Sequence, residues 1–217
     1  MIAELEPVTL TLGEVLYEPG DTISHVYFPS TSLVSLLTLA DGHLALEVGI
    51  VGRDGMVGIP LVLGHTTSSV RALVQGEGAA LRMKAGIFLK LFRLSPPLQR
   101  ELYLYIHALM AQISQTAACN RFHVVESRLA RWLLMTHDRV QRDEFCMTQE
   151  FLGHMLGVRR VGVTKAAQAL QKNNLIKYSR GNITLLDRTG LEAAACGCYK
   201  IVKDMNDDVK TENTLNN

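Results

Sequence analysis

Hydrogen-bond donors gather in one stretch of this 217-residue sequence, where Arg159 and Arg160 are followed by Thr164 and Lys165. Donors at this helical spacing suit the oxygens of guanine and phosphate, which are acceptors. The segment from Arg159 to Lys177 holds five cations and no acid, although the net charge of the whole chain is only +1. These residues therefore predict a local positive surface that contacts DNA.

Two short amphipathic helices are expected to position these donors. Leu152 and Leu156 share one helical face, Gly157 interrupts it, and a new apolar face follows at Val163 and Leu170. Two such helices joined by a glycine turn are typical of a helix-turn-helix.

A β-hairpin is predicted next, because the apolar runs 175–178 and 183–186 flank Ser179-Arg180-Gly181-Asn182. A hairpin in this place makes the helix-turn-helix winged. The alternative is an arginine-rich, solvated helix in a protein that does not bind DNA, and the hairpin disfavours it.

The rest of the chain predicts an α+β fold. From about residue 8 to 84, short apolar runs alternate with turn residues such as Pro19-Gly20-Asp21, Asp41-Gly42 and Gly76-Glu77-Gly78, which predicts a small β-barrel or roll. Pro96 then marks the start of a helix. We expect a β-roll sensor domain over residues 1–95, a dimerisation helix over 96–124, a winged helix-turn-helix over 125–205 and a disordered polar tail over 206–217.

The helix that follows Pro96 carries an a/d heptad pattern. The predicted seam consists of Leu102, Ile106, Leu109, Ile113, Thr116 and Asn120. Its length and the polar Asn120 favour a homodimer, since such a residue can fix the register of a coiled coil. The alternative is a helix packed on its own barrel. A second helix from about Val125 to Thr136 is expected to bury Leu129, Trp132 and Leu133.

The composition of the chain limits the class of protein and its location. With 47% hydrophobic and 20% charged residues the chain is an ordinary globular protein. It has no apolar run of 18 residues and its first residues lack a signal-peptide pattern, which predicts a cytoplasmic protein without a membrane partner.

The order of roll, long helix and winged helix-turn-helix resembles the Crp/Fnr family of bacterial transcription regulators. The opening stretch Gly13–Asp21 resembles the first strand and turn of the family's cyclic-nucleotide-binding roll, and 128–134 and 148–175 resemble its DNA-binding domain. The resemblance implies a cytoplasmic homodimer that binds a palindromic operator in double-stranded DNA and works with RNA polymerase. It implies DNA contacts by Thr148, Gln149, Arg159, Arg160, Val161, Thr164, Lys165 and Arg180.

Val161 departs from the family's pattern, in which a glutamate often follows the arginine. Valine cannot accept a hydrogen bond from cytosine, but it can pack on a thymine methyl group. We therefore expect a half-site that differs from the family's common one.

The nucleotide cassette of the family is also absent. Ile59 stands where a ribose-binding glutamate is expected, and Thr66 aligns with the phosphate-binding arginine. Cyclic AMP binding in the usual mode is therefore not expected. A different small effector would meet Gly58, Ile59, Ser68, Ser69 and Arg71.

No cofactor or metal is predicted. An iron–sulfur cluster of the Fnr type needs clustered amino-terminal cysteines, and no cysteine precedes Cys119. Cys196 and Cys198 have a one-residue spacer that is poor for a metal site without further ligands, so inert thiols are expected. Haem ligation by His25, His43 or His65 remains an open alternative without a supporting motif.

No catalytic motif occurs in the sequence, so an enzyme is not expected. The leading hypothesis is a homodimeric transcription regulator with an effector other than cyclic AMP. The alternative is a ligand-binding or protein-interaction module whose helix-turn-helix only packs.

Overall fold

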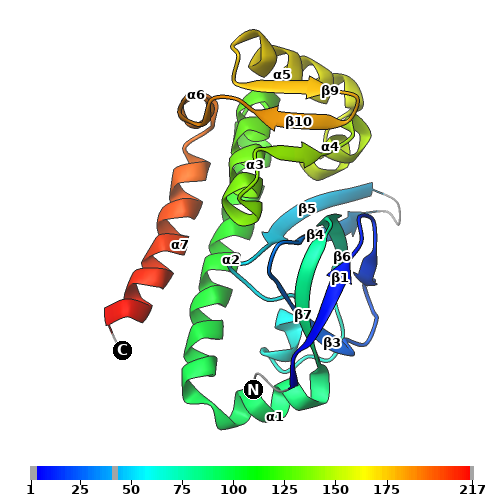
Figure 1. Cartoon of the computed structure of the whole chain (residues 1–217), viewed down its shortest axis with the longest axis vertical. Coiled ribbons are helices and arrows are strands. Elements are labelled where there is room, and N and C mark those ends of the chain that lie inside the picture. The colour runs from blue at the N-terminus through cyan, green and yellow to red at the C-terminus, as the bar shows by residue number, and fades with distance from the viewer. Residues whose placement is uncertain (1–3, 41–43, 216–217) are drawn as a thin grey trace.

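The computed structural model describes residues 4–40 and 44–215, so the turn predicted at Asp41-Gly42 lies outside the described residues. The amino-terminal half is a β-roll of two antiparallel sheets (Figure 1). Its strands are β1 Glu6–Leu10, β2 Val15–Tyr17, β3 His25–Pro29, β4 Leu33–Ala40, β5 Leu44–Val51, β6 Arg71–Gly76 and β7 Gly78–Lys84. The orders are β1-β7-β3 and β2-β6-β4-β5. One core joins both sheets, with Val26 and Val74 fully buried, which confirms the predicted roll.

Helix α1 (Ala85–Leu94) closes the roll, and the 27-residue helix α2 (Pro96–Phe122) follows it directly. Ser95 caps α2, because its hydroxyl accepts a hydrogen bond from the backbone nitrogen of Leu98. At 1.5 Å per residue α2 is about 40 Å long. It runs past the roll to the carboxy-terminal half of the chain (Figure 1).

The predicted seam of α2 faces mainly its own chain. Leu102, Ile106 and Leu109 are buried in the core of the roll, so these three side chains are not available to a partner. Thr116 and Asn120 accept hydrogen bonds from arginines of the next helix. Three of the six seam residues therefore pack on the roll, and the dimer seam as a whole stays a prediction. Of the six residues, Ile113 is the most exposed, at 37%.

The carboxy-terminal half contains the expected winged helix-turn-helix. Its elements are α3 Val125–Val140, β8 Glu144–Cys146, α4 Gln149–Leu156, α5 Arg160–Lys172, β9 Ile176–Ser179 and β10 Asn182–Leu185. Leu129, Trp132 and Leu133 of α3 are buried beneath α4 and α5, as predicted. The short strand β8 was not predicted; it pairs with β10, so the wing has the order β8-β10-β9.

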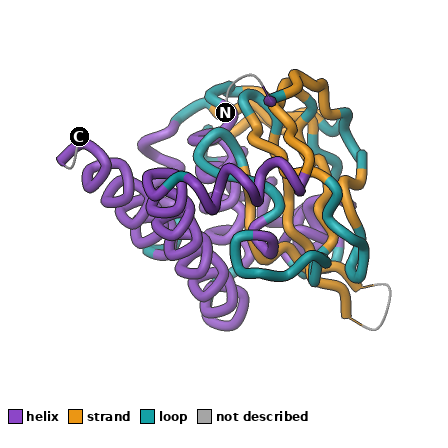
Figure 2. Tube along the Cα trace, turned by 90° about the horizontal axis from the view of Figure 1, so that it is seen from below, coloured by secondary structure: helices purple, strands orange, loops and turns teal. Residues whose placement is uncertain are grey.

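Two helices end the described chain, α6 (Arg188–Ala194) and α7 (Cys198–Leu215). The prediction of a disordered tail from residue 206 is wrong up to Leu215, because α7 is helical there; Asn216 and Asn217 lie outside the described residues. α7 runs back along α2 (Figures 1 and 2) and buries Tyr199 and Val202. This packing explains a helix where the polar sequence alone favours disorder.

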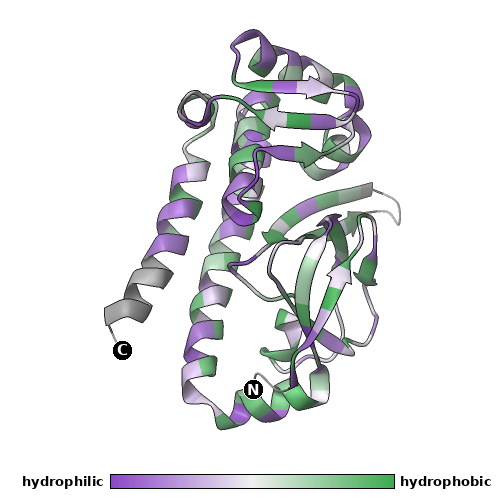
Figure 3. Ribbon diagram, viewed as in Figure 1, coloured by the Kyte–Doolittle hydropathy of each residue, from purple (hydrophilic) through white to green (hydrophobic). Residues whose placement is uncertain are grey.

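Hydrophobic and hydrophilic residues alternate along α2 and the strands of the roll (Figure 3). Such alternation fits elements with one packed and one solvated face. Across the described ranges, no helix combines the length and apolarity needed to cross a bilayer.

Candidate DNA-binding surface

The turn between α4 and α5 depends on Thr148 and Gly157. The Thr148 hydroxyl accepts a hydrogen bond from the backbone nitrogen of Phe151 at 3.1 Å and so caps α4. Gly157 ends α4 with φ of 60°, a left-handed conformation that favours glycine. Together they set the start and the end of the first helix of the motif.

Gln149 connects the two helices at their exposed side. Its side-chain oxygen accepts hydrogen bonds from the Arg160 Nε at 3.3 Å and from the Thr164 hydroxyl at 2.8 Å. Three of the residues expected to contact DNA are thus brought together. Sequence reasoning placed all three on this surface but did not show that Gln149 orients the other two.

The other donors of α5 project freely from its exposed side. Arg159 caps α5 through its backbone conformation, without a side-chain hydrogen bond to the helix end. Arg159 and Lys165 are exposed, and Val161 between them is 63% exposed. An exposed valine among cations can make an apolar contact with a ligand bound at this helix.

The wing presents Arg180 at the tip of a two-residue hairpin. Ser179 pairs with Asn182, and φ is 51° at Arg180 and 84° at Gly181. Positive φ at both central residues defines the type I′ turn that matches strand twist. The predicted hairpin and its turn are therefore confirmed.

Tyr178 ties the wing to the helix-turn-helix, a contact that the sequence did not reveal. Its hydroxyl donates a hydrogen bond to the carbonyl oxygen of Met147 at 2.9 Å. Partial burial raises the pKa of Tyr178, so the hydroxyl keeps its proton for this bond. A hollow of about 420 Å³ lies alongside, lined by Thr148, Gln149, Glu150, Arg160, Tyr178, Arg180 and Gly181.

This surface is also connected to the roll. The Arg139 guanidinium of α3 forms an ion pair with Asp54 at 2.9 Å, and Arg139 is only 6% exposed. Leu46 of β5 contacts the turn of the motif so closely that a Cβ on Gly157 would lie 2.7 Å from its Cδ1. A single core includes Leu37 of the roll and Trp132 of α3. The roll and the helix-turn-helix half are therefore joined by packed side chains.

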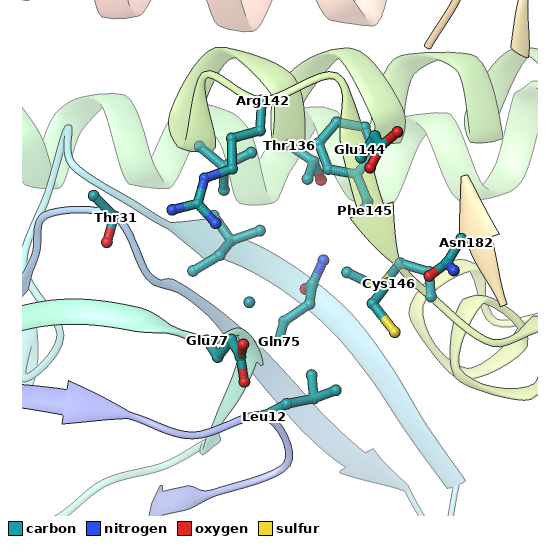
Figure 4. Close-up of a pocket in the computed structure, with 14 residues that line it drawn as sticks. Leu12, Thr31, Gln75, Glu77, Thr136, Arg142, Glu144, Phe145, Cys146 and Asn182 are labelled. Carbon is teal, nitrogen blue, oxygen red and sulfur yellow. The ribbon is translucent and has the colours of Figure 1, made fainter. Parts of the chain in front are cut away.

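A cavity of about 370 Å³ lies between the two halves (Figure 4). Gln75 of the roll and Thr136 of α3 line it, and both are at most 1% exposed. Within the described residues, the Gln75 amide nitrogen and the Thr136 hydroxyl have no hydrogen-bond partner. In Figure 4 the side chains of Arg142 and Glu77 lie on opposite sides of this space. The cavity can therefore hold water or a small polar molecule.

Three of the five residues expected around an effector, Ile59, Ser68 and Arg71, already have partners in the roll. Ile59 belongs to the roll core, next to Gly58 with φ of 116°. The Ser68 hydroxyl donates to the carbonyl of Val70 at 2.6 Å, whereas Ser69 is exposed. Arg71 Nε lies 2.8 Å from Glu18, which neutralises its charge. An effector site built from these five residues remains a prediction.

Comparisons with known proteins agree with this architecture. The family of Crp-like helix-turn-helix domains matches residues 127–194. No curated protein matches the sequence.

Solved structures share the fold at low sequence identity. FixK2 from Bradyrhizobium japonicum superposes with a TM-score of 0.74 at 14% identity, covering 89% of this chain and 98% of that one. A transcriptional regulator of the CRP family from Thermus thermophilus gives 0.71 at 18% identity, with 87% and 96% covered. The c-di-GMP responsive regulator CLP from Xanthomonas campestris gives 0.65 at 20%, with 86% and 96% covered.

Residues 127–194 therefore form a Crp-like helix-turn-helix domain. The chain as a whole shares its fold of roll, long helix and winged helix-turn-helix with solved regulators of the CRP family.

Proposed function

We propose that the chain acts as a cytoplasmic homodimer that binds a palindromic operator and regulates transcription with RNA polymerase. The observation that carries the proposal is the exposed donor surface of α5, flanked by Thr148 and by Arg180 of the wing. A helix of this kind fits the major groove, and two copies related by a dyad read two half-sites.

Each candidate contact residue has a distinct role in this proposal. Arg160, oriented by Gln149, reads guanine, and Val161 packs on a thymine methyl group. Arg159, Thr164 and Lys165 contact base edges or phosphates, while Thr148 and Arg180 contact the backbone.

The dimer is proposed to form through the solvated face of α2, which includes Ile113 of the heptad, rather than through the buried Leu102, Ile106 and Leu109. Tyr103 and Met110 are 54% and 62% exposed, and Ile113 continues the same apolar face. Spacings of seven and three residues place the three on one side of a helix. Such large apolar side chains in a row mark a surface that a partner covers.

The operator proposal is tested by selecting genomic DNA fragments on the purified protein. Enrichment of a palindromic sequence with a half-site unlike that of a glutamate-containing recognition helix is expected. An Arg160→Ala protein provides the matched control and should lose the enrichment. Absence of any enriched site would favour the ligand-binding or protein-interaction module.

Regulation is proposed to use a small effector other than cyclic AMP. Ile59 offers no acceptor for a ribose hydroxyl, and Arg71 is paired with Glu18. The interdomain cavity fits a small polar molecule better and touches both halves, since the Gln75 amide nitrogen and the Thr136 hydroxyl lack a partner among the described residues. Binding there would change how the roll packs on α3 and thereby bias DNA affinity.

Native mass spectrometry of the purified protein tests this regulation. A co-purified organic molecule is expected on the wild type and on Ser69→Ala, and its loss is expected for Gln75→Leu. Calorimetry with cyclic AMP should show no micromolar binding, whereas such binding would contradict the proposal. A protein that carries no organic ligand and binds DNA constitutively would also contradict it.

A further inference from the structure

Four metal-ligating side chains converge between α2 and α7. Cys119 and His123 lie at the end of α2, while Cys196 and Cys198 lie at the start of α7. Their ligand atoms all lie within 4.8 Å of one another. The sulfurs of Cys119 and Cys196 are 3.4 Å apart, and the Cys198 sulfur is 3.4 Å from the His123 Nδ1.

Local structure explains how the four side chains meet. Cys119 and His123 are four residues apart and so lie on the same side of the helix end. Cys196 lies in the connection from α6 to α7, and Cys198 is the first residue of α7. Arg188 of α6 holds this connection in place, because its Nη2 donates to Asp138 and to the Tyr199 hydroxyl, each at 2.7 Å.

We propose that Cys119, His123, Cys196 and Cys198 bind one Zn²⁺ ion in a tetrahedral Cys₃His site. With Zn–S bonds of about 2.3 Å, the sulfurs of a tetrahedral site lie about 3.8 Å apart. The observed separations, from 3.4 Å to at most 4.8 Å, surround this value. A set of three thiolates and one imidazole is typical of structural zinc.

The surroundings fit a metal with anionic ligands. The Gln115 amide donates to the Cys198 sulfur at 3.1 Å, the kind of outer hydrogen bond that orients a ligand. Three thiolates with Zn²⁺ leave one negative charge, and the guanidinium groups of Arg128 and Arg131 lie close enough to act on the Cys119 thiol.

The small size of the site favours a single metal ion over a multinuclear cluster. A cluster of two or more iron atoms needs ligands spread around a larger group, whereas these four surround a single ion. Cys119 and Cys198 are buried, at 0% and 2% exposure, but His123 is exposed and leaves a path for entry. Soft thiolates disfavour Mg²⁺ and Ca²⁺.

Zinc in this place would be structural rather than catalytic, because all four positions are filled by the protein. It would fasten the start of α7 to the end of α2. This assignment is independent of the operator and of the effector proposed above.

Metal content of the full-length protein tests the site. Purified wild type should carry one zinc per chain by plasma mass spectrometry, and Cys146→Ser should do the same, because the exposed Cys146 lies outside the cluster. Cys119→Ser and Cys198→Ser should lose the zinc. Gln115→Ala should keep the ligands but bind zinc about 10- to 100-fold more weakly.

Two further measurements distinguish loss of the zinc ligands from misfolding of a variant. Cobalt added to metal-free wild type should give thiolate charge-transfer bands and the visible bands of tetrahedral cobalt. A thiol reagent should label only Cys146 rapidly in the zinc form, and the partly exposed Cys196 as well after chelation. Circular dichroism verifies the fold of each variant.

Three results would overturn the proposal. The first is a folded wild type that takes up neither zinc nor cobalt. The second is zinc binding by Cys119→Ser and Cys198→Ser equal to that of Cys146→Ser. The third is a Cys119–Cys196 disulfide in the protein purified under reducing conditions.

Discussion

The indole of Trp132 donates a hydrogen bond to Glu47, with Nε1 and Oε1 2.8 Å apart. This bond joins α3 of the DNA-binding half to β5 of the roll, and Glu47 is only 5% exposed. Burial raises the pKa of Glu47 to about 7, although hydrogen bonds from Ser35 and Trp132 oppose the shift. The Ser35 hydroxyl contacts both Glu47 and the Gln75 oxygen. One hydroxyl hydrogen cannot serve both, so a proton on Glu47 completes the network.

Protonation of Glu47 should make stability depend on pH. The folded chain holds this proton more tightly than the unfolded chain, whose glutamate titrates near 4.5. The free energy of unfolding should therefore fall by on the order of 3 kcal/mol as pH rises from about 4.5 to about 7. Denaturant unfolding of wild type and Glu47→Gln across this range measures the effect. The variant should lose this slope, whereas the exposed Glu77→Gln should retain it; equal slopes for all three would refute the assignment.

Arg160→Ala should weaken binding to the selected operator by roughly 1–3 kcal/mol, the usual value of a bidentate base contact. Binding to a scrambled sequence should change much less. Fluorescence anisotropy on both DNAs measures the difference. Equal losses on the two sequences would show that Arg160 contacts phosphate rather than a base.

Arg180→Ala should weaken binding to both DNAs alike, because the wing tip is expected to contact phosphate. The slope of log affinity against log salt concentration should decrease in magnitude by about 1. A salt titration of wild type and variant provides the test. A changed sequence preference would reverse the roles assigned to Arg160 and Arg180.

Gln149→Ala should reduce operator affinity by about 1 kcal/mol, since Arg160 and Thr164 would lose their shared acceptor. Melting temperature should change little, because these groups lie at the surface. Combining Gln149→Ala with Arg160→Ala in a double-mutant cycle should reveal coupling. Strictly additive losses would mean that Gln149 does not orient Arg160.

Gly157→Ala should destabilise the protein by about 1–3 kcal/mol. The alanine would adopt positive φ, and its Cβ would lie 2.7 Å from the Leu46 Cδ1. Thermal unfolding of Gly157→Ala, with and without Leu46→Ala, separates backbone strain from this clash. Partial rescue by Leu46→Ala is expected, and an unchanged loss would exclude contact across the domains as a cause.

Met110→Glu should shift the protein from dimer to monomer in sedimentation equilibrium if the solvated face of α2 forms the dimer. A charge on Met110 opposes burial against a partner but costs little in the monomer, where this side chain is 62% exposed. Lys200→Glu, on an exposed position of α7, serves as a charge control. A dimer that survives Met110→Glu would place the interface elsewhere.

Sequence periodicity predicted the elements whose signals are local. The glycine turn at Gly157, the hairpin at Arg180 and the buried face around Trp132 follow from residues close in the chain. The periodicity did not predict which element packs against each apolar face. The a/d series through Leu102 and Ile106 describes a helix packed in a groove, and the same pattern serves a second protomer or the protein's own roll.

Long-range contacts account for the other differences. Cys119 and Cys196 are 77 residues apart, so neither sequence neighbourhood indicates the other. The sequence held two signals for this metal site, the four-residue spacing of Cys119 and His123 and the Cys196–Cys198 pair. Joining them required that α7 be a helix packed on α2. Polar residues after 205 favoured disorder, because they do not reveal that α7 packs on α2 further upstream, where Gln115 donates to the Cys198 sulfur.

The return of α7 along α2 has a mechanical consequence. The main chain leaves α2 at His123 in an extended conformation and enters α3 at Val125, so this short joint would act as a simple pivot by itself. Because α7 comes back from α6 and lies on α2, the DNA-binding half is attached to the long helix by α7 as well as by the short joint and the arginines of α3. A body held at two points cannot swing about one of them unless the second attachment slides or detaches. Any rotation of the recognition helices relative to α2 therefore requires α7 to move as well.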